Sequence, residues 1–482
     1  MKIAFFEPYA FNIPHFERCL ELIQTHLDQG DQAIYIGCDG NLNACDINQY
    51  HYKAICNACI QRRKIGLGLI SEAIPYKNYK YLSPEQEKAI ADFMQALKFD
   101  DVETLMKVKY DNFDIGLAVS SSIISLIRDP NPDVKKYRSI FNHYLRDALS
   151  LYFSLKNHFI EEKVELVYLF NGRFAYMRAA IRAAESLGID YYTHEVGPSI
   201  DKYLTFKNAL PHSLQYAYDD MMAFWEAADP ETREEIGASF YEDQQKGNVL
   251  SKIYHFTKKQ KTGLLPEEWD NAKENISIFN SSEDEFAAIG EEWKKGVYPS
   301  QYTGIQKIVT HFADKPNFHI YLRVHPNLGT ASPAIVKELY NIQAPNFTII
   351  APDSPISTYQ LAASSDKVLT FSSSVGIEAV YRGTPGIILA ENFYKRTGST
   401  YNPETHEEVI ELLSTMDLPV KDKTGALIYG YWLKQRGIPY KYYQADSLFE
   451  GKFKGTEIKV GGFTGFVSKL FQKIQYARKK FL

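Results

Sequence analysis

The sequence lacks several features that would place it in a common class. It has no uninterrupted apolar run of 18 or more residues, so it predicts no membrane-spanning helix. Its first strand-to-helix turn lacks the Gly-x-Gly-x-x-Gly fingerprint, which argues against a dinucleotide-dependent dehydrogenase. The net charge of −5 gives no reason to expect a nucleic-acid partner. Glu7, His15 and Glu17 interrupt the apolar N-terminal segment, which favours a first strand and helix over a signal peptide and predicts a cytoplasmic protein.

Cysteine is scarce and unevenly placed, because all five cysteines lie before residue 60. A reducing compartment makes structural disulfides unexpected. One interpretation is a structural Zn²⁺ or iron–sulfur site in a Cys-rich insertion at 38–59, where four thiolates would leave no open position for catalysis. The alternative is a set of ordinary buried thiols. The four candidate ligands are Cys38, Cys45, Cys56 and Cys59.

Strands, Gly-containing turns and amphipathic helices alternate along both halves of the chain, which is typical of parallel α/β sheets. The 482 residues are too many for one ordinary core. A polar stretch over 245–275, without apolar periodicity, predicts a domain boundary. We therefore predict an α/β protein with two Rossmann-like domains facing a cleft. The predicted parts are residues 1–250, residues 270–450 and a C-terminal amphipathic helix at 455–482.

The most informative segment is KVLTF-SSSVGIEAVYRGTPGI, in which an apolar strand leads through a serine-rich turn into a helix. Serine hydroxyls and the backbone N–H groups of a helix N-terminus favour an anion such as a phosphate. Gly376 permits close approach of the backbone, and Glu378 is placed to accept hydrogen bonds from ribose hydroxyls. The alternative is that the serines only cap the helix, although one serine suffices for a cap. The three serines are Ser372, Ser373 and Ser374.

A second polar group, Arg323, His325 and Asn327 in LRVHPN, lies at the carboxyl end of an earlier strand. Strand alternation predicts that the three side chains share one side, although Pro326 bends the chain. A histidine in this position can donate to a departing phosphate, and Arg323 can neutralise it. The alternative is a histidine packed at a turn beside proline.

The His-Pro pair followed by SSSVGIEAVYRGTPGI resembles the C-terminal half of two-domain bacterial glycosyltransferases of the GT-B architecture, above all capsule polysaccharide and lipopolysaccharide biosynthesis proteins. FFEPYAFNIPHFE and the FNGR…HEVG…PH series are similar to capsule-synthesis proteins. The resemblance implies a nucleotide-sugar donor whose phosphate contacts His325, Ser373 and Ser374 and whose nucleotide contacts Glu378. It also implies donor binding by 270–450 and acceptor binding by 1–250.

An inverting enzyme of this kind needs a general base from the acceptor side. The carboxylate of Glu195, which follows a strand and precedes Gly197-Pro198, is one candidate, and His15 is another. Asn171 and Arg173 end the preceding strand, and Arg173 is suited to an anionic acceptor or a phosphate. His212 is a further acceptor-side candidate. Each of these residues has an alternative, purely structural interpretation.

The sequence thus predicts a metal-independent glycosyltransferase acting on a surface polysaccharide or lipid-linked glycan, with no cofactor required for catalysis and no Asp-x-Asp triplet. One rival is a CDP-polyol phosphotransferase of cell-surface polymer synthesis. Another is a non-catalytic nucleotide- or glycan-binding partner in a capsule assembly complex. A nucleotide-sugar epimerase is less favoured.

The C-terminal segment FTGFVSKLFQKIQYARKKFL is basic and amphipathic. Such a helix suits the anionic inner-membrane surface, where a lipid-linked acceptor would lie, and predicts a peripheral membrane protein. The alternative is a helix that packs back onto the first domain and leaves its charges solvated.

Overall fold

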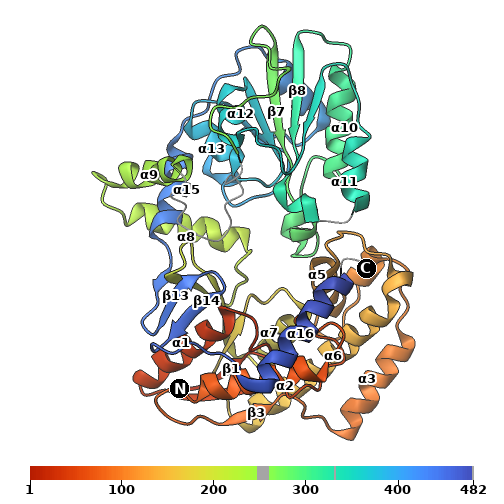
Figure 1. Cartoon of the computed structure of the whole chain (residues 1–482), viewed down its shortest axis with the longest axis vertical. Helices are drawn as coiled ribbons and strands as arrows, with labels where there is room; N and C mark the ends of the chain where they lie inside the picture. The colour runs from red at the N-terminus through yellow and green to blue at the C-terminus, as the bar shows by residue number, and fades with distance from the viewer. Residues whose placement is uncertain (247–259, 331–332, 480–482) are drawn as a thin grey trace. The chain divides into compact units, whose positions relative to one another are not determined.

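The computed structural model describes residues 1–246, 260–330 and 333–479, and the chain divides into two compact units (Figure 1). Unit 1 consists of Met1–Ile127, Asn131–Pro211 and Gly437–Leu482, and unit 2 consists of Arg128–Pro130 and His212–Arg436. The predicted α/β class, with a largely parallel sheet in each half, is confirmed. The cleft stays a prediction.

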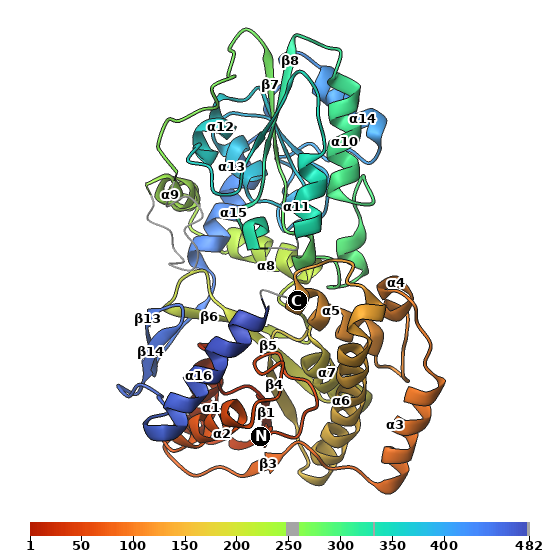
Figure 2. The ribbon, with the colours of Figure 1, turned by 45° about the vertical axis from the view of Figure 1, so that its right-hand side comes forward.

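Unit 1 is built on a seven-stranded sheet in the order β12-β6-β5-β4-β1-β2-β3. Strands β1 to β5 run parallel, whereas β6 pairs antiparallel with β5, and β12 pairs antiparallel with β6. Helices α1 and α2 lie on one side of the sheet and α6 and α7 on the other (Figure 2). The strands are β1 Lys2–Phe6, β2 Gln32–Gly37, β3 Tyr76–Asn78, β4 Leu166–Phe170, β5 Asp190–Val196, β6 Lys202–Lys207 and β12 Ile438–Pro439, with a hairpin of β13 Tyr443–Ser447 and β14 Glu450–Phe453. The helices are α1 His15–Asp28, α2 Lys53–Leu67, α3 Pro84–Ala96, α4 Val102–Met106, α5 Ile115–Ile127, α6 Val134–Glu161, α7 Ala175–Ser186 and α16 Gly462–Lys479.

Unit 2 is built on a five-stranded parallel sheet in the order β11-β10-β7-β8-β9. Helices α10 and α11 lie on one side of this sheet, and α12 and α13 lie on the other (Figure 1). The strands are β7 Glu274–Phe279, β8 Phe318–Arg323, β9 Phe347–Ile350, β10 Lys367–Thr370 and β11 Gly386–Ile388. The helices are α8 Leu214–Glu226, α9 Arg233–Gln245, α10 Gln301–Phe312, α11 Pro333–Tyr340, α12 Thr358–Ser364, α13 Val375–Tyr381, α14 His406–Ser414 and α15 Thr424–Gln435.

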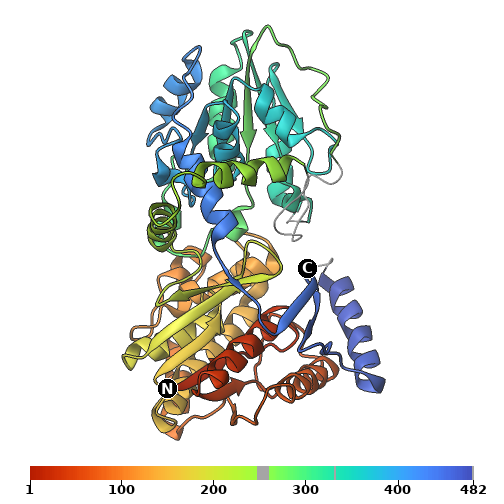
Figure 3. The ribbon, with the colours of Figure 1, turned by 90° about the vertical axis from the view of Figure 1, so that its left-hand side faces the viewer.

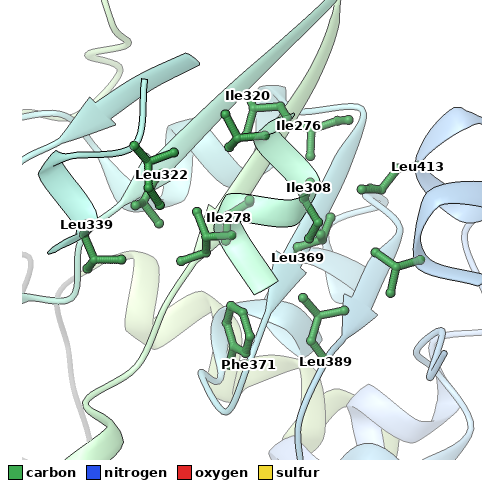
Figure 4. Close-up of a cluster of buried hydrophobic side chains, with 14 of the residues drawn as sticks. Ile276, Ile278, Ile308, Ile320, Leu322, Leu339, Leu369, Phe371, Leu389 and Leu413 are labelled. Carbon is green, nitrogen blue, oxygen red and sulfur yellow. The ribbon is translucent and has the colours of Figure 1, made fainter. Parts of the chain in front are cut away.

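The core of unit 2 follows from strand alternation. Ile276 and Ile278 of β7 point to the face covered by α10, α11 and α14, where they pack with Ile308, Leu339 and Leu413 (Figure 4). Phe279 and Tyr321 point to the opposite face and pack against α12 and α13. Because both faces are covered, the strands are apolar almost throughout, and polar side chains collect at the strand ends.

The domain boundary drawn at residue 250 needs correction. Helices α8 and α9 precede that boundary, yet their apolar side chains pack with α13 and α15 in one cluster of unit 2. The Tyr241 hydroxyl, for example, donates to the Ala426 carbonyl oxygen at 2.6 Å. At the other end, the chain returns to unit 1 at Gly437, not after residue 450. The polar stretch at 245–275 therefore lies inside unit 2, and its residues 247–259 lie outside the described residues.

The C-terminal helix α16 runs along the outside of unit 1 beside α2 (Figure 3). The Gln475 side-chain amide donates to the Ile47 carbonyl oxygen at 2.9 Å, and the Phe471 ring lies 4.8 Å from the Tyr52 ring. None of the helices in the described ranges is both long and apolar enough to cross a bilayer.

Candidate functional site

Polar segments follow three adjacent parallel strands of unit 2. The serine turn at 372–374 follows β10, the segment 280–285 follows β7, and His325 follows β8. The sheet order β10-β7-β8 makes β7 the central strand of the three. Because carboxyl ends of parallel strands meet at one edge, the three segments share the edge at which α/β sheets bind ligands. The sequence predicted the outer two segments of this edge but gave β7 no role in it.

His325 is held at this edge by its neighbours. Its backbone N–H donates to Asn280 Oδ1 at 2.8 Å, and its Nδ1 accepts from the backbone N–H of Asn327 at 3.2 Å. Burial, reinforced by the nearby Arg128 charge, lowers the pKa of His325 to about 4. The ring is therefore neutral near pH 7, and its proton lies on Nε2 because Nδ1 accepts. An imidazole in this tautomer can donate to an anionic oxygen.

A second charged group at this edge was not found from the sequence. Arg128 Nε lies 2.6 Å from Asp284 Oδ2, and Arg128 Nη2 donates to Ser282 Oγ at 3.2 Å. The Ser282 hydroxyl in turn donates to Asp284 Oδ1 at 2.5 Å. Asp284 is buried, and this triad fixes the segment after β7 close enough to His325 for both charges to act on its pKa.

The serine turn is ordered by its own hydrogen bonds. Ser372 Oγ donates to the Glu391 carbonyl oxygen at 3.0 Å, and Ser373 Oγ accepts from the Val375 backbone N–H at 3.3 Å. Ser374 Oγ donates to Glu378 Oε1 at 2.7 Å. Ser374 is the residue before α13, but its side chain makes no capping hydrogen bond to the backbone N–H groups of the helix. The phosphate role of the three serines stays a prediction.

Tyr394 positions this turn from beneath. Its buried hydroxyl donates to the Ser373 carbonyl oxygen at 2.5 Å. No local signal marks this residue, because Tyr394 follows Ser373 by 21 positions and lies outside any motif.

Two residues of the serine motif have a different explanation from the predicted one. A Cβ at Gly376 would lie 2.6 Å from Ile388 Cδ1 and 2.8 Å from the Tyr394 hydroxyl, so the glycine is required for packing of α13 against the sheet. The proposed close approach to a ligand is not needed to explain it. Glu378 is buried and accepts from Ser374, and burial raises its pKa. Its ribose contact stays a prediction.

Arg323 and Asn327 also have partners within unit 2. The Arg323 guanidinium is buried and donates to the carbonyl oxygens of Ala351 and Ser354 at 3.1 and 3.2 Å. Asn327 Nδ2 donates to Glu285 Oε1 at 2.9 Å. The Arg323 contacts lie on the segment that follows β9. Arg323 is therefore separated from His325 and Asn327, although the sequence predicts that the three side chains lie on one side of the strand end. A phosphate contact of Arg323 stays a prediction.

Unit 1 contains a cavity of about 300 Å³ at the carboxyl side of β1 and β4. This volume is at the lower end of the range for small-ligand sites, about 300–1,000 Å³. Its wall combines aromatic rings with hydroxyl, amide, imidazole and carboxyl groups. The lining residues are Tyr9, Asn12, His15, Asp46, Ile47, Gln49, Ser122, Ser125, Leu126, Phe170, Phe174, Tyr176 and Met177. Of the predicted acceptor-side residues, the structure brings His15 to this cavity.

The other acceptor-side candidates lie elsewhere. Glu195 Oε2 accepts from Asn171 Nδ2 at 2.7 Å, and Glu195 Oε1 accepts from the Val196 backbone N–H at 2.9 Å. The Arg173 guanidinium lies over the Phe174 ring, 4.7 Å from its centroid. His212 is the residue at which the chain enters unit 2, and its backbone carbonyl oxygen accepts from the Trp293 indole at 2.8 Å. Its acceptor-side role stays a prediction. The base role of Glu195 stays a prediction.

The cysteines gather as the sequence suggested, but not as a ligand set. Cys38, Cys45, Cys56 and Cys59 line one small pocket of about 30 Å³ together with His51. All four are free thiols, and burial raises the pKa of each. The described part of the chain contains no group of three or more His, Cys, Asp or Glu side chains arranged to hold a metal ion. These residues therefore do not fit a metal in this arrangement, and the metal stays a prediction.

Comparison with known proteins gives one sequence match and several distant structural ones. Residues 294–417 match the family described as capsule polysaccharide biosynthesis protein. No curated protein matches the chain. A β-Kdo 2,4 transferase, KpsC of Thermosulfurimonas dismutans, is 14% identical with a TM-score of 0.36, over 64% of this chain and 87% of that one.

Two further solved structures are similar over most of both chains. Methanocaldococcus jannaschii UDP-GlcNAc 2-epimerase is 11% identical with a TM-score of 0.27, over 89% of this chain and 98% of that one. The glycosyltransferase SnogD of Streptomyces nogalater is 12% identical with a TM-score of 0.24, over 91% and 96%. Similarities this distant do not assign an activity. The sequence match does carry weight, and it confirms the predicted resemblance: the segment 294–417 of unit 2 is related to the capsule polysaccharide biosynthesis proteins.

Proposed function

We propose that this chain is a glycosyltransferase of capsule or lipopolysaccharide assembly. Unit 2 would hold the nucleotide-sugar donor, and unit 1 would hold a glycan or lipid-linked acceptor. The observation that carries the proposal is the family match over 294–417, because this segment contains both His325 and the serine turn. The cavity of unit 1 supports the acceptor assignment, since aromatic faces suit the C–H faces of sugar rings while hydroxyl and amide groups bind sugar hydroxyls.

In this proposal the carboxyl edge of unit 2 stabilises the leaving phosphate. His325 donates from Nε2 to a phosphate oxygen, and a hydroxyl of the serine turn donates to another. Such donors act most strongly on the charge that develops as the bond to the sugar breaks. Arg128 contributes positive potential at the same edge while its contact with Asp284 holds the segment after β7.

A nucleotide panel tests the donor site. Thermal unfolding of the EDTA-treated protein is measured with CMP, CDP, UDP, GDP and dTDP, since the proposal gives no catalytic role to a metal. One nucleotide at 100 times its Kd is expected to stabilise the protein by about 2.7 kcal/mol. Sugars activated by that nucleotide are then assayed for transfer.

The products of the same assay distinguish the rival functions. A polyol-phosphate product with release of CMP would indicate the phosphotransferase. Nucleotide binding without turnover of any donor would indicate a binding partner. If no nucleotide raises the Tm, the donor site is wrong.

We further propose that α16 docks unit 1 on an anionic membrane surface. The helix turns its small and polar side inward, because Gly465 and Ser468 are buried. Its apolar stripe points outward: Phe463 is 82% exposed, Phe466 69% and Leu470 49%. Lys469 and Lys473 are exposed on the same helix, and such lysines contribute about 1 kcal/mol each near anionic lipid. Three more basic residues follow at 478–480, whose side chains lie outside the described residues.

Vesicle binding tests the membrane proposal. The Phe466→Glu/Leu470→Glu variant is expected to bind phosphatidylglycerol-containing vesicles at least about tenfold more weakly, a change of about 1.4 kcal/mol. Ile160→Glu is the matched control, because Ile160 is 62% exposed on α6 and lies outside the stripe. Equal binding by both variants, or equal wild-type binding to pure phosphatidylcholine, would reject anionic docking by α16. Concentration-dependent self-association lost in the double variant would instead indicate a second copy as the occupant.

A further inference from the structure

The cavity of unit 1 contains a carboxyl group that the sequence did not single out. Asp46 lies in the Cys-rich segment and lines the same wall as His15. Within the described cavity wall, these two residues are the only lining side chains that titrate below about pH 8 in their ordinary state. Which of them can take a proton from an acceptor hydroxyl depends on their hydrogen bonds.

His15 is arranged as a donor. Its Nδ1 lies 3.2 Å from Nη1 of Arg18, whose permanent charge makes that nitrogen the acceptor. The same Arg18 nitrogen lies 3.3 Å from Nδ1 of His194. Burial, followed by the Arg18 charge and His194, lowers the pKa of His15. The ring is neutral with its proton on Nε2, so it can donate a hydrogen bond to a ligand but is a poor proton acceptor.

Asp46 is arranged as an acceptor. The Tyr144 hydroxyl donates to Asp46 Oδ1 at 2.5 Å, which fixes the carboxyl group against α6. Tyr9 and Tyr176 line the cavity beside it, and Cys45 precedes it. A second carboxyl group, Asp147, accepts from the Tyr176 hydroxyl at 3.2 Å. Asp46 forms no ion pair with any described residue, and the Tyr9 hydroxyl is its second hydrogen-bond donor beside Tyr144. A carboxylate that lines a cavity without a cationic partner is placed to accept the proton of a ligand hydroxyl.

Glu195, the predicted base, is arranged differently. Both of its oxygens already accept hydrogen bonds, from Asn171 and from the Val196 backbone, and it does not line the cavity. Protonation would break or weaken one of those contacts. The structure therefore gives Asp46 two advantages over Glu195: it has a place in the cavity wall, and tyrosine hydroxyls are its hydrogen-bond partners.

We propose that Asp46 is the general base that deprotonates the acceptor hydroxyl, with His15 donating from Nε2 to an acceptor oxygen. The inference rests on the proposed function and applies to a single displacement with inversion. The hydroxyl proton passes to the Asp46 carboxylate, and the hydroxyl oxygen forms the new bond to the anomeric carbon. The bond from that carbon to the phosphate breaks, and its electron pair leaves on the nucleotide. Asp46 later returns the proton to water.

The test compares Asp46→Asn with Glu195→Gln. The asparagine side chain keeps an oxygen for the Tyr144 hydroxyl, so the fold is expected to hold, whereas the basic oxygen pair is lost. Transfer by Asp46→Asn is expected to fall about 10²–10⁴-fold, the usual contribution of general acid–base catalysis. The nucleotide-induced Tm increase is expected to stay near wild type, because the nucleotide binds to unit 2. Glu195→Gln is expected to lose less than about tenfold, in line with lost hydrogen bonds alone.

The pH profile separates a base from a structural role. For the wild type, log kcat/KM is expected to fall with slope 1 on the acid side, as the Asp46 carboxylate is protonated, and this limb is expected to vanish in Asp46→Asn. Transfer within about threefold of wild type by Asp46→Asn, or a product with retained anomeric configuration, would overturn the assignment while leaving the transferase function standing. If the wild type transfers no sugar from any donor, both proposals fail together.

Discussion

Replacing His325 by alanine is expected to lower kcat/KM for sugar transfer by about 10²–10³-fold, the usual cost of removing one preorganised donor from a developing anion. The reason is the tautomer: Nδ1 accepts from the Asn327 backbone, so Nε2 is the nitrogen that carries the proton. A neutral ring donates without charge, so the loss is expected to be nearly constant between pH 6 and pH 8, well above the pKa of about 4. Steady-state kinetics at saturating acceptor measure the effect.

Two conservative variants make the test specific. His325→Asn places an acceptor near the position of Nδ1 and removes the Nε2 donor, so it is expected to be stable and nearly as inactive as the alanine variant. His325→Gln places an amide N–H near the position of Nε2 and is expected to recover part of the activity. Equal activity of the asparagine and glutamine variants would show that His325 acts through the backbone of Asn327 and not through its own proton.

The sequence predicted the parts of this edge that are local. A strand followed by a serine turn, and another followed by His-Pro, must bring polar groups to the carboxyl edge of any parallel sheet. Strand order is not local, and it alone makes β7 the central strand between them. Arg128 lies 154 positions before Ser282, and nothing in its surroundings marks it as part of unit 2. Such a contact depends on tertiary packing, which periodicity does not encode.

The same limit applies to Gly376 and to the domain boundary. The contacts that exclude a side chain at Gly376 include Ile388 and Tyr394, which later segments supply, so its role in packing is not visible in the local sequence. Asp46 lies within the Cys-rich segment, whose cysteine spacing indicates a metal site and gives no sign of a carboxylate in a cavity wall. The boundary at 250 followed local polarity, whereas the apolar cluster of α8, α9, α13 and α15 joins segments about 200 positions apart.

The largest effect on stability is expected at the opposite edge of the same sheet. Lys367, at the amino end of β10, is fully buried and forms an ion pair with Glu274 at the amino end of β7, which is 8% exposed. Lys367→Met leaves the Glu274 carboxylate buried without a cation, and breaking such a pair costs about 3–5 kcal/mol. For a unit of this size the Tm is expected to fall by roughly 6–20 °C, measured by circular dichroism.

Three comparisons identify the cause of that loss. Lys367→Met/Glu274→Leu removes both charges and is expected to recover at least half of the lost Tm, because no unpaired charge stays buried. Lys294→Met breaks an exposed pair with Glu291 and is expected to cost less than about 0.5 kcal/mol. Because the serine turn lies at the other end of β10, kcat per folded molecule of Lys367→Met is expected to match wild type at 20 °C. If the Tm of Lys367→Met falls no further than that of Lys294→Met, water or another group neutralises Glu274. If kcat of Lys367→Met falls as well, the two edges of the sheet are energetically coupled.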